Sequence, residues 1–71
     1  MQPMEDFIIE LIERGDPGIL NRIPNYIQGY MAQHGRNASF ERDRVAQAVA
    51  DRAPDSHLKW QVVDLIRAQN A

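Results

Sequence analysis

The chain has 71 residues, a formal net charge of −2 and no cysteine. This length allows one domain, residues 1–71, with a thin core, and the lack of cysteine excludes disulfides and thiolate metal sites. The slightly negative charge is not that of a polycation that grips phosphate non-specifically. No apolar run approaches the roughly 18 residues of a membrane span, and the N-terminus lacks the pattern of a signal peptide. We therefore expect a soluble, cytoplasmic protein that does not enter a membrane.

Residues 4–14 have the periodicity of an amphipathic helix. At 100° per residue, one broad apolar arc contains, from edge to edge, Phe7, Leu11, Met4, Ile8, Ile12 and Ile9. The acidic side chains of Glu5 and Asp6 stand in the first turn, where the helix dipole favours them. Gly15 follows the last turn and suits the position that ends a helix.

The next segment begins with Asp16-Pro17, a pair that is typical of a helix start. Its apolar residues keep helical phase from Ile19 to Met31, but Pro24 lies among them. A proline inside a helix removes a backbone hydrogen bond and costs roughly 3 kcal/mol. We therefore predict a short turn over residues 17–22 and a new helix that begins near Pro24, with one kinked helix as the alternative.

The third helix is predicted to run from Ser39, as N-cap, to Ala53, where Pro54 ends it. Its buried face is rich in alanine, so that a neighbouring helix can pack closely. This face contains Val45, Ala46, Val49, Ala50 and Ala53.

The last helix is predicted from Asp55 to about Gln69, with Asp55 or Ser56 as its cap. Four residues fill an arc of about 100° that faces a core, and Val63 and Trp60 extend the apolar surface beyond it. The four residues of the arc are Leu58, Val62, Leu65 and Ile66. Since no stretch alternates with a period of two, the sequence predicts an all-α fold, a small bundle of three to four helices.

The first and last helices each carry an apolar arc of about 200° or more, wider than a helix on a monomeric three-helix core requires. We expect the surplus to form a partner surface, because rigid aromatic side chains with a polar rim suit interfaces. The predicted partner-binding residues are Trp60, Val63, Arg67, Ile9 and Ile12. A homodimer is the simplest arrangement. The alternative is that Trp60 only covers the edge of the monomer's core.

Candidate catalytic and metal-binding residues are few. The two histidines, His34 and His57, are isolated and lack metal-ligand spacing. The two serines, Ser39 and Ser56, both stand at predicted caps. No glycine-rich phosphate loop is present. We therefore expect no catalytic residue, no metal and no cofactor, and the protein is not predicted to be an enzyme.

A second interpretation treats residues 39–69 as a helix-turn-helix that binds DNA as a dimer. The last helix would then enter the groove, and arginines of the third helix would contact the backbone. The residues of this alternative are Arg42, Arg44, Ser56, His57, Lys59 and Gln61. Lys59 is the sole cation at the reading end, and Asp55 would face phosphate, so nucleic acid is not the partner that we expect.

The pattern Ala46-x-Ala48-Val49, Pro54-Asp55, Trp60 and Leu65-Ile66 is similar to the corresponding stretch of the theta subunit family of bacterial DNA polymerase III. The similarity runs from Ala46 to Ile66 and does not extend to the first half of the chain. It implies a small helical accessory protein, without known catalysis, that binds the proofreading subunit. The residues themselves favour the same class: a non-catalytic protein-interaction module, such as an adaptor, inhibitor or accessory subunit, that could self-associate.

Overall fold

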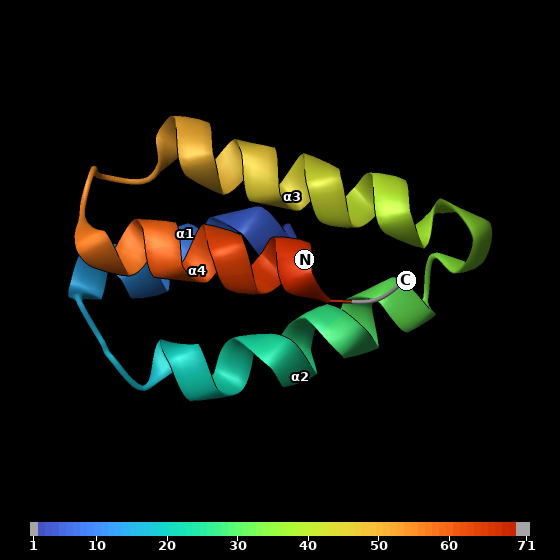
Figure 1. The fold of residues 1–71 in the computed structure, drawn as a ribbon, viewed down its shortest axis with the longest axis horizontal. Coiled ribbons are helices and arrows are strands. Elements are labelled where there is room, and N and C mark those ends of the chain that lie inside the picture. The colour runs from blue at the N-terminus through green and yellow to red at the C-terminus, as the bar shows by residue number, and fades with distance from the viewer. Residues whose placement is uncertain (1, 70–71) are drawn as a thin grey trace.

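The computed structural model describes residues 2–69 and contains only helices within that range, which confirms the predicted all-α class. The helices are α1 (Met4–Arg14), α2 (Ile19–Ala32), the short 3₁₀ helix η1 (Gly35–Asn37), α3 (Ala38–Arg52) and α4 (His57–Ala68). Figure 1 shows that successive α helices run in opposite directions. The result is an up-down-up-down bundle of 32 × 24 × 22 Å.

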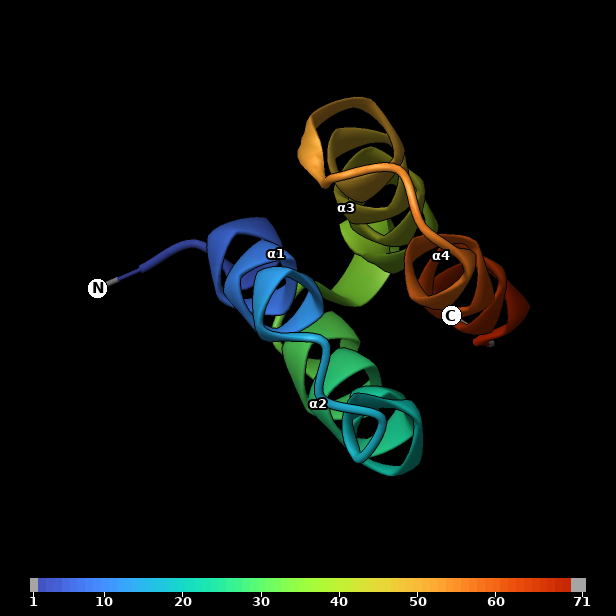
Figure 2. The same ribbon diagram turned by 90° about the vertical axis from the view of Figure 1, so that its left-hand side faces the viewer.

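The four α helices stand at the corners of the bundle, as the end-on view in Figure 2 shows. α1 and α4 occupy opposite corners, and α3 packs against both of them. Contact is densest between α3 and α4, and it is sparse between α1 and α2. This uneven packing determines where the surface of the molecule is hollow.

The core takes side chains from all four α helices. α1 and α2 contribute mainly isoleucine, and α3 contributes valine and alanine, which let the neighbouring helices approach closely. The fully buried side chains of largest volume are Ile8, Ile19, Ile23, Ile27, Ile66, Val45, Val49 and Val62. Burying each of them contributes roughly 1.5–3 kcal/mol, which makes this cluster the main stabilising feature of a small domain.

α1 has the bounds that its periodicity predicts, and it ends as expected at Gly15. Gly15 adopts the left-handed conformation, with φ of 68°, and its N–H bonds to the carbonyl of Ile12. Glycine reaches this conformation without the steric cost of a Cβ atom, so that the chain can turn sharply toward α2.

The predicted break at Pro24 is wrong, because α2 continues through this residue from Ile19 to Ala32. The missing hydrogen bond costs roughly 3 kcal/mol. Four buried side chains lie on one face of α2, on both sides of the proline. Burial of each contributes roughly 1.5–3 kcal/mol, so together they outweigh that cost. These are Ile19, Ile23, Ile27 and Met31. Asp16 does not cap α2 directly, and its carboxylate instead accepts a hydrogen bond from the N–H of Gly18, which precedes the helix.

The corner between α3 and α4 has two side-chain caps. The predicted cap Ser56 accepts a hydrogen bond from the N–H of Lys59 at 3.1 Å. The ammonium group of Lys59 turns back and donates to the carbonyl of Ala53, at the C-terminal end of α3. A cation at this end is favourable, because the last carbonyls of a helix carry partial negative charge. Ser39 is not the cap of α3, which begins one residue earlier, at Ala38.

None of the helices within residues 2–69 is long and apolar enough to cross a membrane.

Candidate functional site

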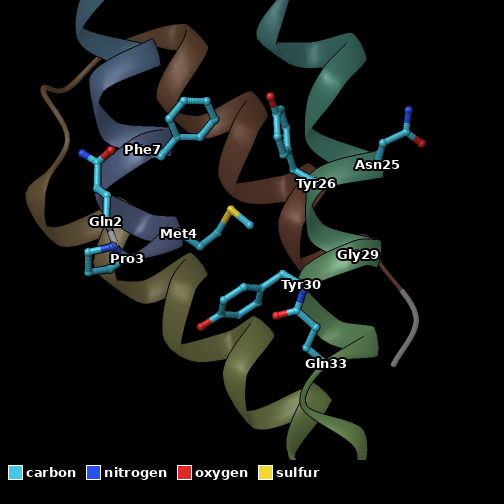
Figure 3. Close-up of a pocket in the computed structure, with 9 residues that line it drawn as sticks. All are labelled: Gln2, Pro3, Met4, Phe7, Asn25, Tyr26, Gly29, Tyr30 and Gln33. Atoms are coloured by element: carbon cyan, nitrogen blue, oxygen red, sulfur yellow. The ribbon is translucent and has the colours of Figure 1, made fainter.

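A hollow of about 700 Å³ lies between α1 and α2, and we call it the aromatic groove. Four apolar or aromatic side chains, Met4 and Phe7 of α1 and Tyr26 and Tyr30 of α2, point into the space between the two helices (Figure 3). Its remaining lining residues are Gln2, Pro3, Asn25, Gly29 and Gln33. No charged side chain is among these residues, so the groove presents an apolar floor with amide and hydroxyl groups at its edges.

The floor of the groove is a pair of aromatic rings that bridges the two helices. The ring centroids of Phe7 and Tyr26 lie 5.3 Å apart with an interplanar angle of 70°. This edge-to-face arrangement is the one that aromatic pairs prefer. Phe7 is half-buried, whereas 40% of Tyr26 stays exposed. The pair therefore fixes the floor and leaves an accessible aromatic surface.

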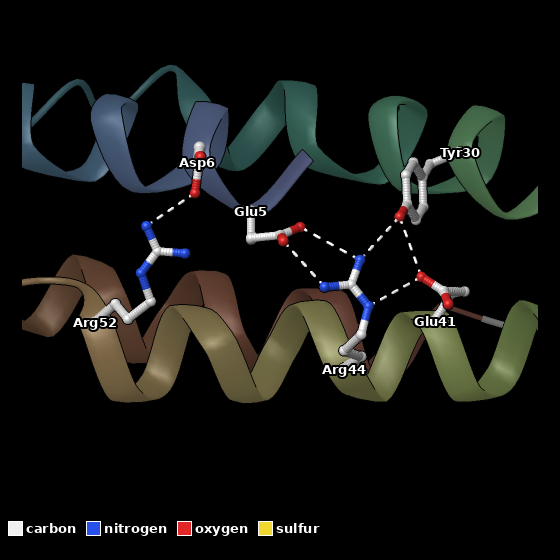
Figure 4. Close-up of polar contacts among 6 residues, drawn as sticks. All are labelled: Glu5, Asp6, Tyr30, Glu41, Arg44 and Arg52. Carbon is white, nitrogen blue, oxygen red and sulfur yellow. Dashed lines mark hydrogen bonds and ion pairs between the residues drawn. The ribbon is translucent and has the colours of Figure 1, made fainter. Parts of the chain in front are cut away.

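Tyr30 is held in place by polar groups of α3 (Figure 4). Its hydroxyl accepts a hydrogen bond from Arg44 at 3.1 Å and donates one to Glu41 at 3.2 Å. Burial raises the pKa of the Tyr30 hydroxyl. These two hydrogen bonds fix the position of the ring at the groove.

Arg44 also clamps the first turn of α1 to α3. Its guanidinium group contacts both carboxylate oxygens of the buried Glu5, at 2.9 and 3.4 Å, and its Nε contacts Glu41 at 3.0 Å. Burial acts to raise the pKa of Glu5, but the hydrogen bonds and charge of Arg44 outweigh it and lower the pKa. About two turns of α3 further on, a second ion pair of the same type lies nearer the surface, where Arg52 contacts Asp6 at 2.8 Å.

A second hollow of about 430 Å³ adjoins the groove along α2. It shares Asn25 and Tyr26 with the groove and adds Asn21 and Arg22. Arg22 is exposed, and among the described residues it takes part in no ion pair. The two hollows adjoin at Asn25 and Tyr26, and we call their combined surface the channel. Its apolar side chains lie in the aromatic groove, and the second hollow is polar and carries its one cation, Arg22.

Gly29 widens the groove at its middle. A Cβ atom built on this residue would meet nothing within 4 Å, so the backbone of α2 is uncovered there. Glycine inside a helix costs roughly 1 kcal/mol relative to alanine. At this position the missing side chain leaves room for another backbone to approach closely.

Trp60, the centre of the predicted partner surface, lies outside the aromatic groove on α4 and is 47% exposed. Its indole N–H donates to Asp55 at 2.9 Å, and the ammonium of Lys59 lies 4.6 Å from the ring centroid. Arg67 is also exposed and contacts Gln47 at 3.5 Å. A partner role for Trp60 and Arg67 stays a prediction.

The expectation that Ile9, Ile12 and Val63 lie on an exposed partner surface is wrong, because all three are buried in the monomer's core. The reason is that each α helix of this bundle packs against at least two others. Most of a wide apolar arc is therefore buried between helices of the same molecule. The partly uncovered apolar surface of α1 is Phe7, at the other edge of the arc, together with Met4 in the first turn of the helix, and both residues line the groove.

The residues of the DNA-binding alternative are mostly engaged within the molecule. Lys59 is only 6% exposed, and Ser56 caps α4. Arg44 is held by Glu5, and Arg42 donates to the backbone carbonyl of Gln69 at 2.7 Å. His57 and Gln61 are exposed on α4. The structure therefore does not place a free lysine at the proposed reading end of the helix.

Within residues 2–69 no group of three histidine, cysteine, aspartate or glutamate side chains could hold a metal ion. His34 packs its ring on Tyr30, with the centroids 4.4 Å apart. The residues that line the groove themselves offer aromatic contact, apolar surface and hydrogen bonding.

Sequence reasoning missed the groove, although one signal was present. Phe7 and Met4 belong to the same apolar arc as Ile9 and Ile12, and periodicity alone does not tell which edge of that arc remains uncovered. The open edge depends on how far α1 and α2 are separated, which is a property of the packed bundle.

Comparisons with protein-family models, with curated proteins and with solved structures each found no match to this chain. The similarity to the theta subunit family is therefore carried only by the residues named above.

Proposed function

We propose that this protein is a small, non-catalytic protein-interaction module, an adaptor, inhibitor or accessory subunit, and that the aromatic groove is its binding site. The observation that carries the proposal is a preformed apolar groove with Phe7 and Tyr26 as its floor and Tyr30 fixed by two hydrogen bonds. Aromatic residues and methionine are enriched at protein interfaces, and charged residues are depleted at their centres.

The shape of the groove supports a segment of protein as its occupant. The groove is open to solvent, because Tyr26 on its floor keeps 40% of its surface exposed. A segment of chain can therefore enter laterally and cover the aromatic floor. Little reorganisation would accompany binding, since Arg44 already holds α1 through its ion pair with Glu5 and Tyr30 through a hydrogen bond, and such preorganisation lowers the cost of association.

Site-specific photo-crosslinking tests this proposal. A photoreactive phenylalanine analogue replaces Tyr26 in the groove, Trp60 on α4 or, as control, the exposed Glu13 on α1. In a lysate of the source cells we expect a protein adduct from the Tyr26 position and none from the Glu13 position. Adducts with a second copy would identify self-association, and adducts from Trp60 alone would move the site to α4.

A charge substitution supplies the matched control. Tyr26→Glu should abolish the adduct formed by a second photoreactive position at Met4, because it places a charge on the groove floor. Gln28→Glu adds the same charge to the same helix outside the groove, where Gln28 contacts Gln69, and should leave the adduct intact. Capture of DNA instead of protein, or adduct formation that ignores Tyr26→Glu, would overturn the proposal.

A further inference from the structure

We propose that the occupant of the aromatic groove is an amphipathic helix whose apolar face covers Phe7 and Tyr26 and whose acidic side chain pairs with Arg22. This inference rests on the proposed function and specifies the chemistry of the partner. Three features carry it: the helical walls of the groove, the uncovered backbone at Gly29 and the charge of Arg22, which pairs with no carboxylate within residues 2–69.

The walls of the groove favour a helix over an extended strand. The described residues form helices only, so their backbone groups bond within each helix and offer no sheet edge to an extended peptide. A helix needs no backbone partner, and its side-chain ridges fit a groove between two other helices. At Gly29, where a Cβ would meet nothing within 4 Å, the backbone of such a helix can come close to α2.

The dimensions of the channel match a short helix. The lining positions on α2 and its C-cap extend from Asn21 to Gln33, which corresponds to roughly 18 Å at a rise of 1.5 Å per residue. A partner helix of about three turns covers that length and presents apolar side chains at positions i, i+3 or i+4, and i+7.

The charge of the channel favours an acidic residue at one end of that helix. Arg22 is the one charged side chain that lines either hollow, and it takes part in no ion pair among the described residues. No carboxylate lines the channel to oppose a negative ligand group. An aspartate or glutamate of the partner would thus meet a guanidinium fork that binds no carboxylate of the described part of the chain.

A second copy of this chain fits less well. The other exposed large apolar side chains, Phe40 of α3 and Trp60 of α4, do not line the groove, so no continuous apolar face surrounds it. Nine residues line the groove, whereas a stable interface takes about 20–30 residues a side. The site therefore matches one short segment.

A peptide-display selection tests the inference. The probe is a library of random 16-residue peptides, panned against the folded, full-length protein. We expect enrichment of apolar residues at helical spacing, with aspartate or glutamate beside one end of the apolar stripe. A selected peptide should gain helical circular dichroism when it binds, and Tyr26→Glu should weaken its binding at least tenfold.

Selection against Arg22→Glu then tests the charge. Acidic peptides should bind this variant about fivefold more weakly or worse, and reselection should yield lysine or arginine at the position that was acidic. Arg14→Glu is the matched control, since Arg14 is exposed at the end of α1 and lines neither hollow, and it should change affinity less than twofold. Circular dichroism of each free variant checks that it folds.

Three results would overturn the inference: selection of proline-rich or other non-helical peptides, binding indifferent to Arg22→Glu, or no selected peptide at all. None of these cancels a Tyr26-dependent protein adduct in the crosslinking experiment, so the proposed function can stand while the helical partner is rejected. A dimer that buries Tyr26 in sedimentation and crosslinking would reject the helical partner and assign the groove to a second copy.

Discussion

Arg44→Met should destabilise the protein by about 2 kcal/mol at pH 7. The substitution leaves the carboxylate of Glu5 buried without its two hydrogen bonds from Arg44. A hydrogen bond to a charged group contributes roughly 1.5–3 kcal/mol. We use the lower part of this range because 40% of the Arg44 side chain is exposed. A domain of this size has a free energy of unfolding of roughly 4–10 kcal/mol, so the loss is a large share of the total. For such a small domain, a loss of about 2 kcal/mol should lower the melting temperature by about 8–16 °C.

Arg52→Met is the matched control. Arg52 is also an arginine of α3 that contacts an acidic residue of α1, but its pair with Asp6 is solvent-exposed, at 55% and 34% of the two side chains. Such exposed pairs contribute roughly 0–1 kcal/mol. Urea unfolding of both variants, followed by circular dichroism, gives the comparison. Equal losses in Arg44→Met and Arg52→Met would refute the idea that burial of Glu5 makes its pair the stronger one.

The same pair should make the effect depend on pH. Because the folded-state pKa of Glu5 lies below its ordinary value of 4.5, the stability from the pair is fully present above that value and is lost as pH falls through the folded-state pKa. In Arg44→Met the buried carboxyl has lost its cation, so its pKa should rise. The difference between wild type and variant should therefore be largest near pH 7 and should shrink as pH falls, first through the raised pKa of the variant and then through the lowered pKa of wild type. A difference that stays constant across this range would contradict the reasoning.

Three further outcomes are expected. Ser56→Ala should cost about 1 kcal/mol through loss of the α4 cap, whereas Ser39→Ala, at a position that caps nothing, should cost less than about 0.5 kcal/mol; thermal melts compare the two. Trp60→Glu should keep the helical circular dichroism signal because Trp60 is half-exposed, and a sedimentation shift to smaller mass would assign this residue to an interface. DNA binding at physiological salt should be weak, because Lys59 is buried, and a tight gel shift that Lys59→Ala abolishes would favour the DNA-binding alternative.

The helices were predictable where local signals agree. At α1, the apolar arc, the acidic first turn and Gly15 all indicate the same bounds, and the structure has them. At α4, Ser56 is the cap, as expected. Near Pro24 the signals conflict, because local propensity indicates a break while the apolar phase continues. The structure follows the apolar phase, since four buried side chains of α2 outweigh one lost hydrogen bond.

The exposure of single residues was less predictable than the helices. Lys59 is buried although lysine is rarely buried, because its ammonium group finds the carbonyl of Ala53 at the end of α3. That contact joins two helices and has no local signature in the sequence. Val63 and Ile9 were predicted to lie on an exposed surface, but they are buried. The reason is related, because the number of helices that pack around each helix depends on the whole bundle and not on local sequence.

The aromatic groove and the ion pairs of Arg44 belong to one arrangement. Glu5 and Phe7 lie within the first turn and a half of α1, and Arg44 draws Glu5 toward α3. α1 therefore packs on α3 and contacts α2 only sparsely. As a result, the contact between Phe7 and Tyr26 forms the floor of an open groove and is not enclosed in the core. The same arginine holds Tyr30 on the other wall of that hollow. Releasing Arg44 should thus let α1 shift toward α2 and narrow the groove, so Arg44→Met should weaken the selected peptides although Arg44 does not line the groove.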